Sequence, residues 1–219
     1  MGQQLKTVRD RFEREATAFD AIYRQDRGMF RTWFNRLFRR PIFERYQKAF
    51  EMIGNARGKT FLDVGCGSGI YSVDLALQGA RYVLGVDFSS QMIQIARKRA
   101  KDNGVDGVCE FKEVNFFEMD SSSLFDFSIA MGVFDYLPDP VTFLQKMKSL
   151  TGGQAILSLP GNSLIRGPLR KLRYKFCAKG NVYYYCYEDI ERIAKQAGYE
   201  HYRIDHLKTG SGFILVAGP

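Results

Sequence analysis

Two acids and three alternate glycines carry the clearest chemical meaning in this sequence. A mostly apolar run at residues 60–64 contains Asp63 and leads directly into Gly65, Gly67 and Gly69. This order is typical of a buried strand that ends in a tight turn at the start of a helix. Such a turn lets the backbone approach a ligand closely and offers the free N–H groups of the helix start. An acid here would repel a pyrophosphate, but it suits a ligand that carries an ammonium group.

A second acid ends the next apolar run. Asp87 follows the run 82–86, eighteen residues after Gly69. A carboxylate at the tip of a second strand can accept hydrogen bonds from both hydroxyls of a ribose. An ammonium site and a ribose site on either side of a glycine turn fit S-adenosylmethionine, which joins an amino acid, a sulfonium and a nucleoside. Phe88 and Met92 are expected to pack against its adenine. Asp87 also suits a helix cap, because Ser89 follows closely.

The ends of the third and fourth predicted strands extend this site. Asn115 and the amide of Phe116 are expected to contact the adenine. Met131 borders the methyl region. Asp135 and Tyr136 follow it and are the candidate catalytic residues, although the sequence singles out no general base. Asp135 equally suits a capping acid ahead of the next helix.

A dinucleotide site is not favoured. The fingerprint G-x-G-x-x-G needs its third glycine at position 70, which is Ile70, and it does not expect Asp63. A tight turn that binds nothing is the other alternative.

Strands and helices alternate from residue 60 onward. Strands are expected at 60–64, 82–86, 108–114, 127–131, 154–159, 199–207 and 213–217, and helices at 70–78, 91–101, 140–150 and 188–196. This order predicts an α/β fold with a mostly parallel sheet and helices on both faces. Ligands bind such sheets at the carboxyl ends of the strands, where the strand order reverses.

The first 58 residues are expected to form a helical cap, and residues 59–219 the main domain. An Arg-flanked apolar stripe at 29–38 predicts one helix, and Pro41 predicts the start of another that ends before Gly54. A connection at 160–187, rich in basic and aromatic residues, interrupts the domain and is longer than usual.

Basic charge is concentrated in two segments. The net charge is +8; residues 1–58 carry 13 Lys/Arg and 7 Asp/Glu, or +6, and residues 161–180 carry 6 Lys/Arg and no acid, or +6, leaving −4 for the remainder. This asymmetry favours an anionic substrate or membrane surface near those segments. Solvated surface charge is the alternative.

The chain resembles the class I S-adenosylmethionine-dependent methyltransferases, in their small-molecule branch. Residues 62–69 match the glycine motif without a gap, and Gly85-Val86-Asp87 matches the second motif. The resemblance implies a Rossmann-like seven-stranded sheet with an antiparallel last strand. It also implies S-adenosylmethionine as donor, S-adenosylhomocysteine as product, and donor contacts from the motif that includes Cys66. Asn115 departs from the usual acid. A cap tyrosine near the donor would be Tyr23.

The acceptor is expected to be a small hydrophobic or anionic molecule that meets the cap and the long connection. Tyr136, together with Arg166, Arg170, Arg173 and Tyr174, is the candidate substrate-binding set. A methyltransferase acting on RNA or protein, and a donor-binding protein without turnover, remain alternatives. The Asn/Asp-Pro-Pro-aromatic motif of nucleic-acid amino-methyltransferases does not occur at the end of the fourth strand, so nucleic acid is not favoured.

The expected location is the cytoplasm, with peripheral contact with a membrane as a further expectation. No run of about eighteen apolar residues and no signal-like N-terminus occurs. Four scattered cysteines and two histidines lack the spacing of a zinc site, so no metal is expected.

Overall fold

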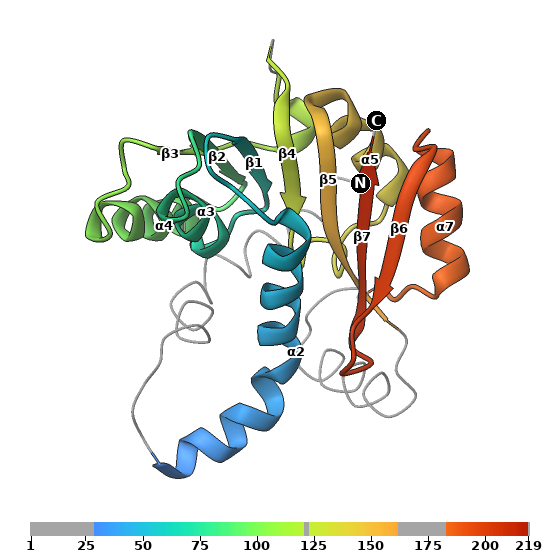
Figure 1. Ribbon diagram of the computed structural model, residues 1–219, viewed down its shortest axis with the longest axis horizontal. Coiled ribbons are helices and arrows are strands. Elements are labelled where there is room, and N and C mark those ends of the chain that lie inside the picture. The colour runs from blue at the N-terminus through green and yellow to red at the C-terminus, as the bar shows by residue number, and fades with distance from the viewer. Residues whose placement is uncertain (1–28, 121–122, 162–182, 219) are drawn as a thin grey trace.

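The computed structural model describes residues 29–120, 123–161 and 183–218, with side chains of its first helix from Arg40 onward. The elements are α2 (Met29–Ile53), β1 (Thr60–Val64), α3 (Ile70–Leu77), β2 (Tyr82–Asp87), α4 (Ser90–Asp102), β3 (Cys109–Glu113), the 3₁₀ helix η1 (Phe116–Glu118), β4 (Phe125–Ala130), α5 (Pro140–Leu150), β5 (Thr151–Pro160), α7 (Tyr187–Gln196), β6 (His201–His206) and β7 (Gly212–Gly218) (Figure 1).

The strands form one seven-stranded sheet in the order β3-β2-β1-β4-β5-β7-β6. β1 pairs in parallel with both β2 and β4, whereas β7 runs antiparallel to its neighbours β5 and β6. The order reverses between β1 and β4, so the glycine turn after β1 lies at the reversal point, where ligands bind such sheets. The predicted α/β fold and its antiparallel last strand are confirmed.

Local sequence explains where the helices begin. The Ser89 hydroxyl accepts the amide of Met92 (3.4 Å) and caps α4. The Asp139 carboxylate accepts the amide of Thr142 (3.1 Å) ahead of Pro140, so the cap of α5 is Asp139 and not Asp135.

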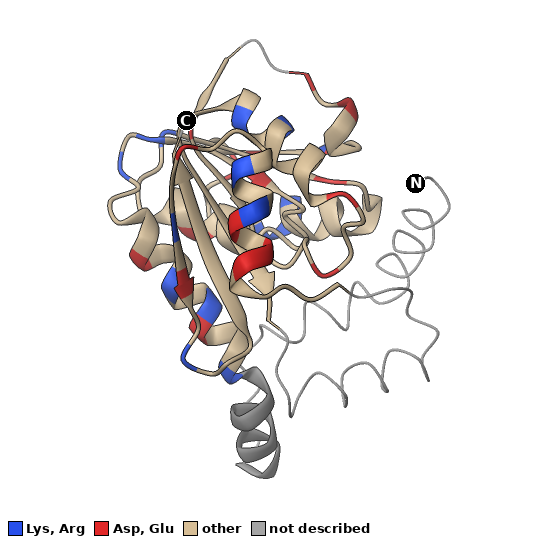
Figure 2. Ribbon diagram, turned by 90° about the vertical axis from the view of Figure 1, so that its right-hand side faces the viewer, with Lys and Arg blue, Asp and Glu red and all other residues tan. Residues whose placement is uncertain are grey.

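The charged side chains of α7 are distributed so that they stabilise the helix dipole. Its first turn carries acids and its last turn carries Lys195, a distribution that Figure 2 shows along the helix. Of the two basic segments, the structure describes residues 29–58 of the first and only Gly161 of the second.

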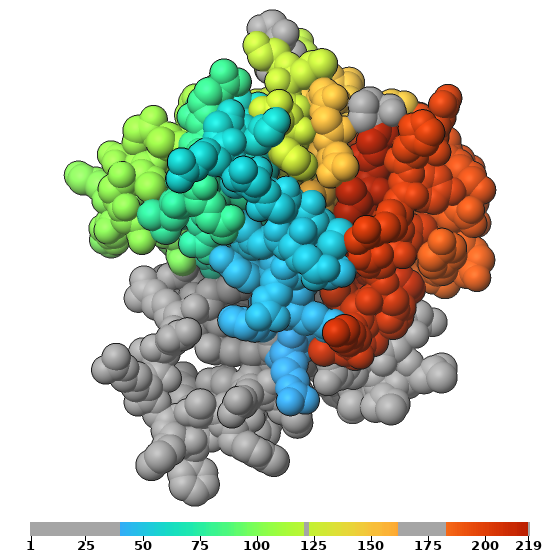
Figure 3. Space-filling view, in the orientation of Figure 1, coloured from blue at the N-terminus to red at the C-terminus, as the bar shows by residue number. Residues whose placement is uncertain are grey.

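The prediction of two helices meeting at Pro41 is wrong, because α2 is one 25-residue helix that contains the proline. Proline removes one hydrogen bond and crowds the preceding turn, which can bend a helix without ending it. α2 changes direction along its length in Figure 1 and packs beside the β6–β7 hairpin in Figure 3. Among the described residues, no helix is both long and apolar enough to span a membrane.

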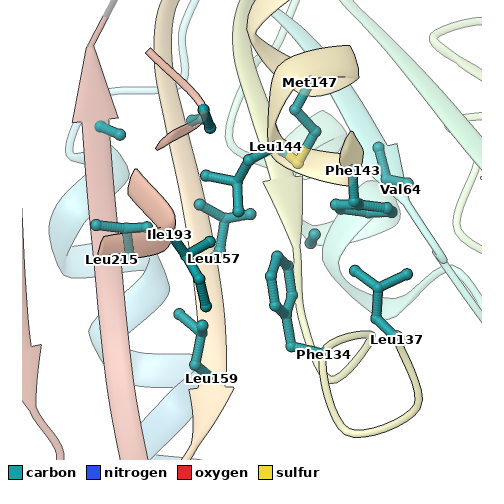
Figure 4. Close-up of a cluster of buried hydrophobic side chains, with 14 of the residues drawn as sticks. Val64, Phe134, Leu137, Phe143, Leu144, Met147, Leu157, Leu159, Ile193 and Leu215 are labelled. Carbon is teal, nitrogen blue, oxygen red and sulfur yellow. The ribbon is translucent and has the colours of Figure 1, made fainter. Parts of the chain in front are cut away.

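The sheet is covered on both faces by apolar side chains. On one face, Phe143, Leu144 and Met147 of α5 and Ile193 of α7 pack over the central strands (Figure 4). On the other face α2, α3 and α4 cover the sheet, with Ala49 of α2 fully buried. The core thus fixes the carboxyl ends of β1, β2 and β4 relative to one another.

Candidate functional site

The glycine turn after β1 is fastened to the neighbouring strand. The amides of Gly65 and Cys66 both donate to the carbonyl of Val86, at 2.8 and 3.0 Å. Gly67 N–H donates to Asp87 Oδ2 at 2.9 Å. These bonds hold the turn against the end of β2, so the two predicted motifs form one site.

The three glycines serve different needs. A Cβ built on Gly69 would lie 2.8 Å from the Ala96 side chain and 3.1 Å from the Phe111 ring, and one on Gly65 would lie 2.5 Å from Val133. Those two glycines allow close packing. A Cβ on Gly67 would meet no atom of the described residues within 4 Å, although its φ of +52° also favours glycine. Gly67 therefore faces open space at the reversal point.

Asp87 lies at the edge of that space. Its side chain is 9% exposed, and Oδ1 accepts the amide of Ser89 at 2.9 Å while Oδ2 accepts that of Gly67. Burial raises the pKa of this carboxyl, and the hydrogen bonds from Ser89 and Gly67 counter the rise. Because a carboxylate oxygen has two lone pairs, each oxygen can accept a further hydroxyl. Ser89 itself caps α4, so Asp87 is not the cap.

Asp63 is the more deeply buried acid, at 1% exposure. Its Oδ2 accepts the Ser72 hydroxyl at 2.6 Å, which ties β1 to the first turn of α3. Burial, with a smaller contribution from Asp87, raises the pKa of Asp63 to about 7, against the lowering effect of Ser72. The carboxylate lies beneath the turn, so we expect it to act on a ligand's ammonium through its charge rather than at the surface.

Binding of S-adenosylhomocysteine is expected to strengthen as the pH rises from 6 to 8. In the free protein Asp63 is mostly protonated at pH 6, because its pKa is raised to about 7. An ammonium on the ligand favours the ionised acid, so affinity should be about tenfold lower at pH 6 than at pH 8. Calorimetry across this range measures it.

Asp63→Asn keeps an acceptor for Ser72 and removes the titration, so its affinity should be lower and flat with pH. A wild-type affinity that does not vary between pH 6 and pH 8 would contradict the assignment.

The adenine side of the predicted site is assembled from β2, β3 and α4. Phe88 is half-buried and Met92 is 2% exposed. Asn115 accepts the amide of Phe117 (3.3 Å) and donates to Glu118 (2.9 Å), so it caps η1. The Phe116 ring belongs to the core, which leaves its backbone as the group toward a ligand. Their contacts with adenine stay predictions.

The segment after β4, residues 131–136, lies against the glycine turn, because a Cβ on Gly65 would stand 2.5 Å from Val133. We call this segment the wall after β4. Met131 and Asp135 are buried at 9% and 5% exposure, and Tyr136 is half-buried. The carbonyl of Asp135 accepts the amide of Tyr183 at 3.0 Å, which brings the end of the long connection to this wall. Tyr183, at the end of the connection, thus lies beside the segment that follows β4. The catalytic roles of Asp135 and Tyr136 stay predictions.

Arg45 of α2 is a site residue that the sequence did not indicate. Its Nη1 lies 3.1 Å from where a Cβ of Gly132 would stand, and Gly132 follows β4 directly after Met131. Val133, next in the chain, is the residue that a Cβ on Gly65 would strike. The guanidinium therefore lies close to the walls that the β1 and β4 turns build.

Several predicted residues fall outside the described part of the chain. These are Tyr23 of the predicted cap and Arg166, Arg170, Arg173 and Tyr174 of the connection. Among the described residues, no three His, Cys, Asp or Glu side chains gather in a way that would hold a metal ion.

The described geometry can hold a cationic nucleoside that also carries a carboxylate. Asp87 supplies acceptors for a sugar, and Asp63 supplies negative charge below an ammonium. Gly67 leaves space for the ligand, and α3 begins at Gly69 with no side-chain cap on its N-terminus. Arg45 supplies the complementary cation. S-adenosylmethionine has each of these groups, so the residues present fit it.

Comparison with known proteins gives one family. The model of the family described as "Methyltransferase domain" matches residues 55–199, which is 145 of 219 residues. The chain is 33% identical over 104 residues to a ubiquinone biosynthesis O-methyltransferase of Actinobacillus pleuropneumoniae, covering 46% of this chain and 44% of that protein. It is 35% identical over 102 residues to the same enzyme of Pasteurella multocida, covering 42% of each. The match therefore spans under half the length of these relatives.

The fold is also found among solved structures. Magnesium protoporphyrin IX methyltransferase from Synechocystis PCC 6803, solved with bound S-adenosylhomocysteine, superposes with a TM-score of 0.76 at 24% identity. The superposition covers 98% of this chain and 99% of that one. At this identity, the likeness supports the fold alone.

Proposed function

This chain belongs to the methyltransferase domain family, and from that premise we propose that it transfers a methyl group from S-adenosylmethionine to a small molecule. One observation carries the proposal: Gly67 N–H donates to Asp87 at the point where strand order reverses, so the glycine turn and the second acid form a single cradle. The cradle faces open space where a Cβ on Gly67 would stand.

The chemistry of the donor needs little from the protein. A methyl group on a sulfonium is activated toward displacement, and the protein contributes mainly alignment and exclusion of water. Asp87 and the amide of Phe116 would orient the nucleoside, and Asp63 would favour the ammonium end. Asp135 or Tyr136 would accept a proton if the acceptor arrives protonated. Asp135 is 5% exposed, so it would act only on a group that enters the wall after β4.

The decisive test is binding followed by turnover. Calorimetry with S-adenosylmethionine and S-adenosylhomocysteine should give micromolar affinity, with NAD as the comparison ligand. Incubation with methyl-labelled donor and a panel of acceptors then separates an enzyme from a donor-binding protein. Magnesium protoporphyrin IX, named for the Synechocystis neighbour, is one acceptor to include. Failure to bind either sulfur compound at millimolar concentration would end the proposal.

Arg45→Ala is expected to weaken S-adenosylhomocysteine about tenfold or more while leaving 5′-methylthioadenosine unchanged. The guanidinium near Gly132 is placed for the carboxylate of the amino-acid tail, and a hydrogen bond to a charged group contributes about 1.5 to 3 kcal/mol. Methylthioadenosine has neither carboxylate nor ammonium. Calorimetry with both ligands gives the ratio. Equal weakening of the two would mean that Arg45 only supports the fold.

The acceptor is proposed to be hydrophobic or anionic, contacted by Tyr136 and by the connection residues Arg166, Arg170, Arg173 and Tyr174, with Tyr23 near the donor. Support comes from the +6 charge of residues 161–180 and from the bond between Tyr183 and Asp135, which joins the end of that connection to the wall after β4.

Peripheral contact between a cytoplasmic protein and an anionic membrane is part of the same proposal. The Arg-flanked apolar stripe of residues 29–38 and the basic connection support it. Flotation with anionic and neutral liposomes at low salt tests it. Equal failure to float with both would remove it.

A further inference from the structure

The middle of α2 is clamped to the β6–β7 turn by one carboxylate. Glu44 accepts the backbone amide of Lys208 with one oxygen and that of Thr209 with the other, the second at 3.0 Å. Partial burial tends to raise the pKa of Glu44, but the hydrogen bonds from Thr209 and Lys208 outweigh it, so the pKa is lowered. The carboxyl therefore stays ionised at neutral pH, and both bonds are charge-assisted.

Other contacts fix the rest of the described helix. Tyr46 donates to Asp74 of α3 at 2.7 Å, and Lys48 pairs with Asp205 of β6 at 3.3 Å. Figure 3 shows the part of α2 from residue 40 onward lying beside the hairpin. Glu44 directly precedes Arg45 in the chain. The Arg45 guanidinium lies near Gly132, at the end of β4.

We propose that Glu44 is a positioning residue whose two-amide clamp sets the place of the Arg45 guanidinium at the donor site. This inference rests on the proposed function, because it needs a donor carboxylate for Arg45 to meet. Packed helices can slide by small amounts past the elements they contact, and α2 contacts β5 and β7. Fixing its backbone at residue 44 removes that freedom before the ligand arrives.

The β6–β7 turn that Glu44 contacts is itself held by backbone hydrogen bonds. This turn is closed by the bond from Gly210 N to Leu207 O (2.8 Å), and Gly161 N donates to the carbonyl of Ser211 at 3.1 Å. The turn is thus held to the end of β5 as well as to α2. A rigid anchor on one side is what lets a carboxylate position a helix on the other.

The experiment compares two ligands across four variants. For Glu44→Ala we expect about fivefold to tenfold weaker S-adenosylhomocysteine and unchanged 5′-methylthioadenosine. Glu44→Gln retains an acceptor oxygen for one amide and should lie between wild type and Glu44→Ala. The double variant Glu44→Ala with Arg45→Ala should bind S-adenosylhomocysteine no more weakly than Arg45→Ala alone. Both substitutions would remove the same contact, that of the Arg45 guanidinium with the ligand carboxylate.

Asp205→Asn is the matched control. It removes the charge that pairs with Lys48, which lies one turn beyond Arg45 in α2, and with Arg203 of β6, and it leaves the Glu44 clamp intact. It should lower the Tm while leaving the ratio of the two affinities at the wild-type value. If Glu44→Ala does not fold, the ratio of the two ligand affinities in Glu44→Gln tests the positioning role in its place.

Weakening of both ligands alike in the Glu44 variants, or a double variant whose losses add, overturns the positioning role. Those results differ from failure of the proposed function, in which the wild-type protein itself binds neither ligand.

Discussion

Asp87→Asn is expected to weaken S-adenosylhomocysteine about 100-fold. Both carboxylate oxygens already accept amides, from Gly67 at 2.9 Å and Ser89 at 2.9 Å, and both retain a lone pair for the ribose hydroxyls. An asparagine amide must turn its NH₂ toward one of those N–H groups. It therefore loses the charge, one ribose acceptor and one of the two contacts with backbone amides. Two charge-assisted hydrogen bonds account for about 3 kcal/mol.

Asp126→Asn provides a matched control for that measurement. The Asp126 carboxylate also accepts a backbone amide from a neighbouring strand, that of Thr60 at 2.8 Å, together with the Thr60 hydroxyl at 3.0 Å. It lies at the amino end of β4, away from the glycine turn. Its loss should lower stability to a similar degree and leave the affinity unchanged. Equal affinities of the two variants would remove Asp87 from the site.

The parts of the site that the sequence predicted are those built from neighbouring positions. Gly65, Gly67 and Gly69 follow a strand and precede a helix, so their geometry depends on a few adjacent residues. Asp87 ends the next strand, and parallel pairing of β1 with β2 brings it to the turn with no further assumption. Family membership confirms the resemblance that these motifs indicated.

The residues that the sequence did not predict depend on distant packing. Arg45 is one of 32 Lys and Arg residues, and only the docking of α2 beside β5 and β7 brings it to Gly132. Ser72 lies nine positions after Asp63, and its hydroxyl meets that acid because α3 folds back over β1. The capping of η1 by Asn115 likewise follows from a 3₁₀ turn that no periodicity signalled. Helix docking and side-chain pairing of this kind carry no local signature.

In α2, the packing of the helix on the sheet outweighs the preference of Pro41 for a helix start. Pro41 predicts a helix start because its own N–H is absent. Residues on both sides favour helix, and the packing of Ala49 and Ile53 on the sheet stabilises the whole element. A single lost hydrogen bond then bends the helix without dividing it.

Gly69→Ala and Gly67→Ala are expected to fail in opposite ways. At Gly69 a methyl would stand 2.8 Å from Ala96 and 3.1 Å from Phe111, at a φ of +74°, so we expect a loss of about 3 kcal/mol in the free energy of unfolding. At Gly67 the methyl would meet no atom of the described part of the chain within 4 Å, so the loss should be about 1 to 2 kcal/mol, from the left-handed backbone alone. Urea unfolding measures both.

Ligand binding should show the reverse order. The methyl of Gly67→Ala would enter the space that Asp87 borders, so S-adenosylhomocysteine should bind about tenfold or more weakly. Folded Gly69→Ala, measured well below its Tm, should keep most of its affinity, because its methyl points at α4 and β3 rather than at the ligand. A Gly67→Ala protein with wild-type affinity would mean that the open space beside the turn is not where the donor lies. The two glycines thus separate packing from recognition within a single five-residue turn.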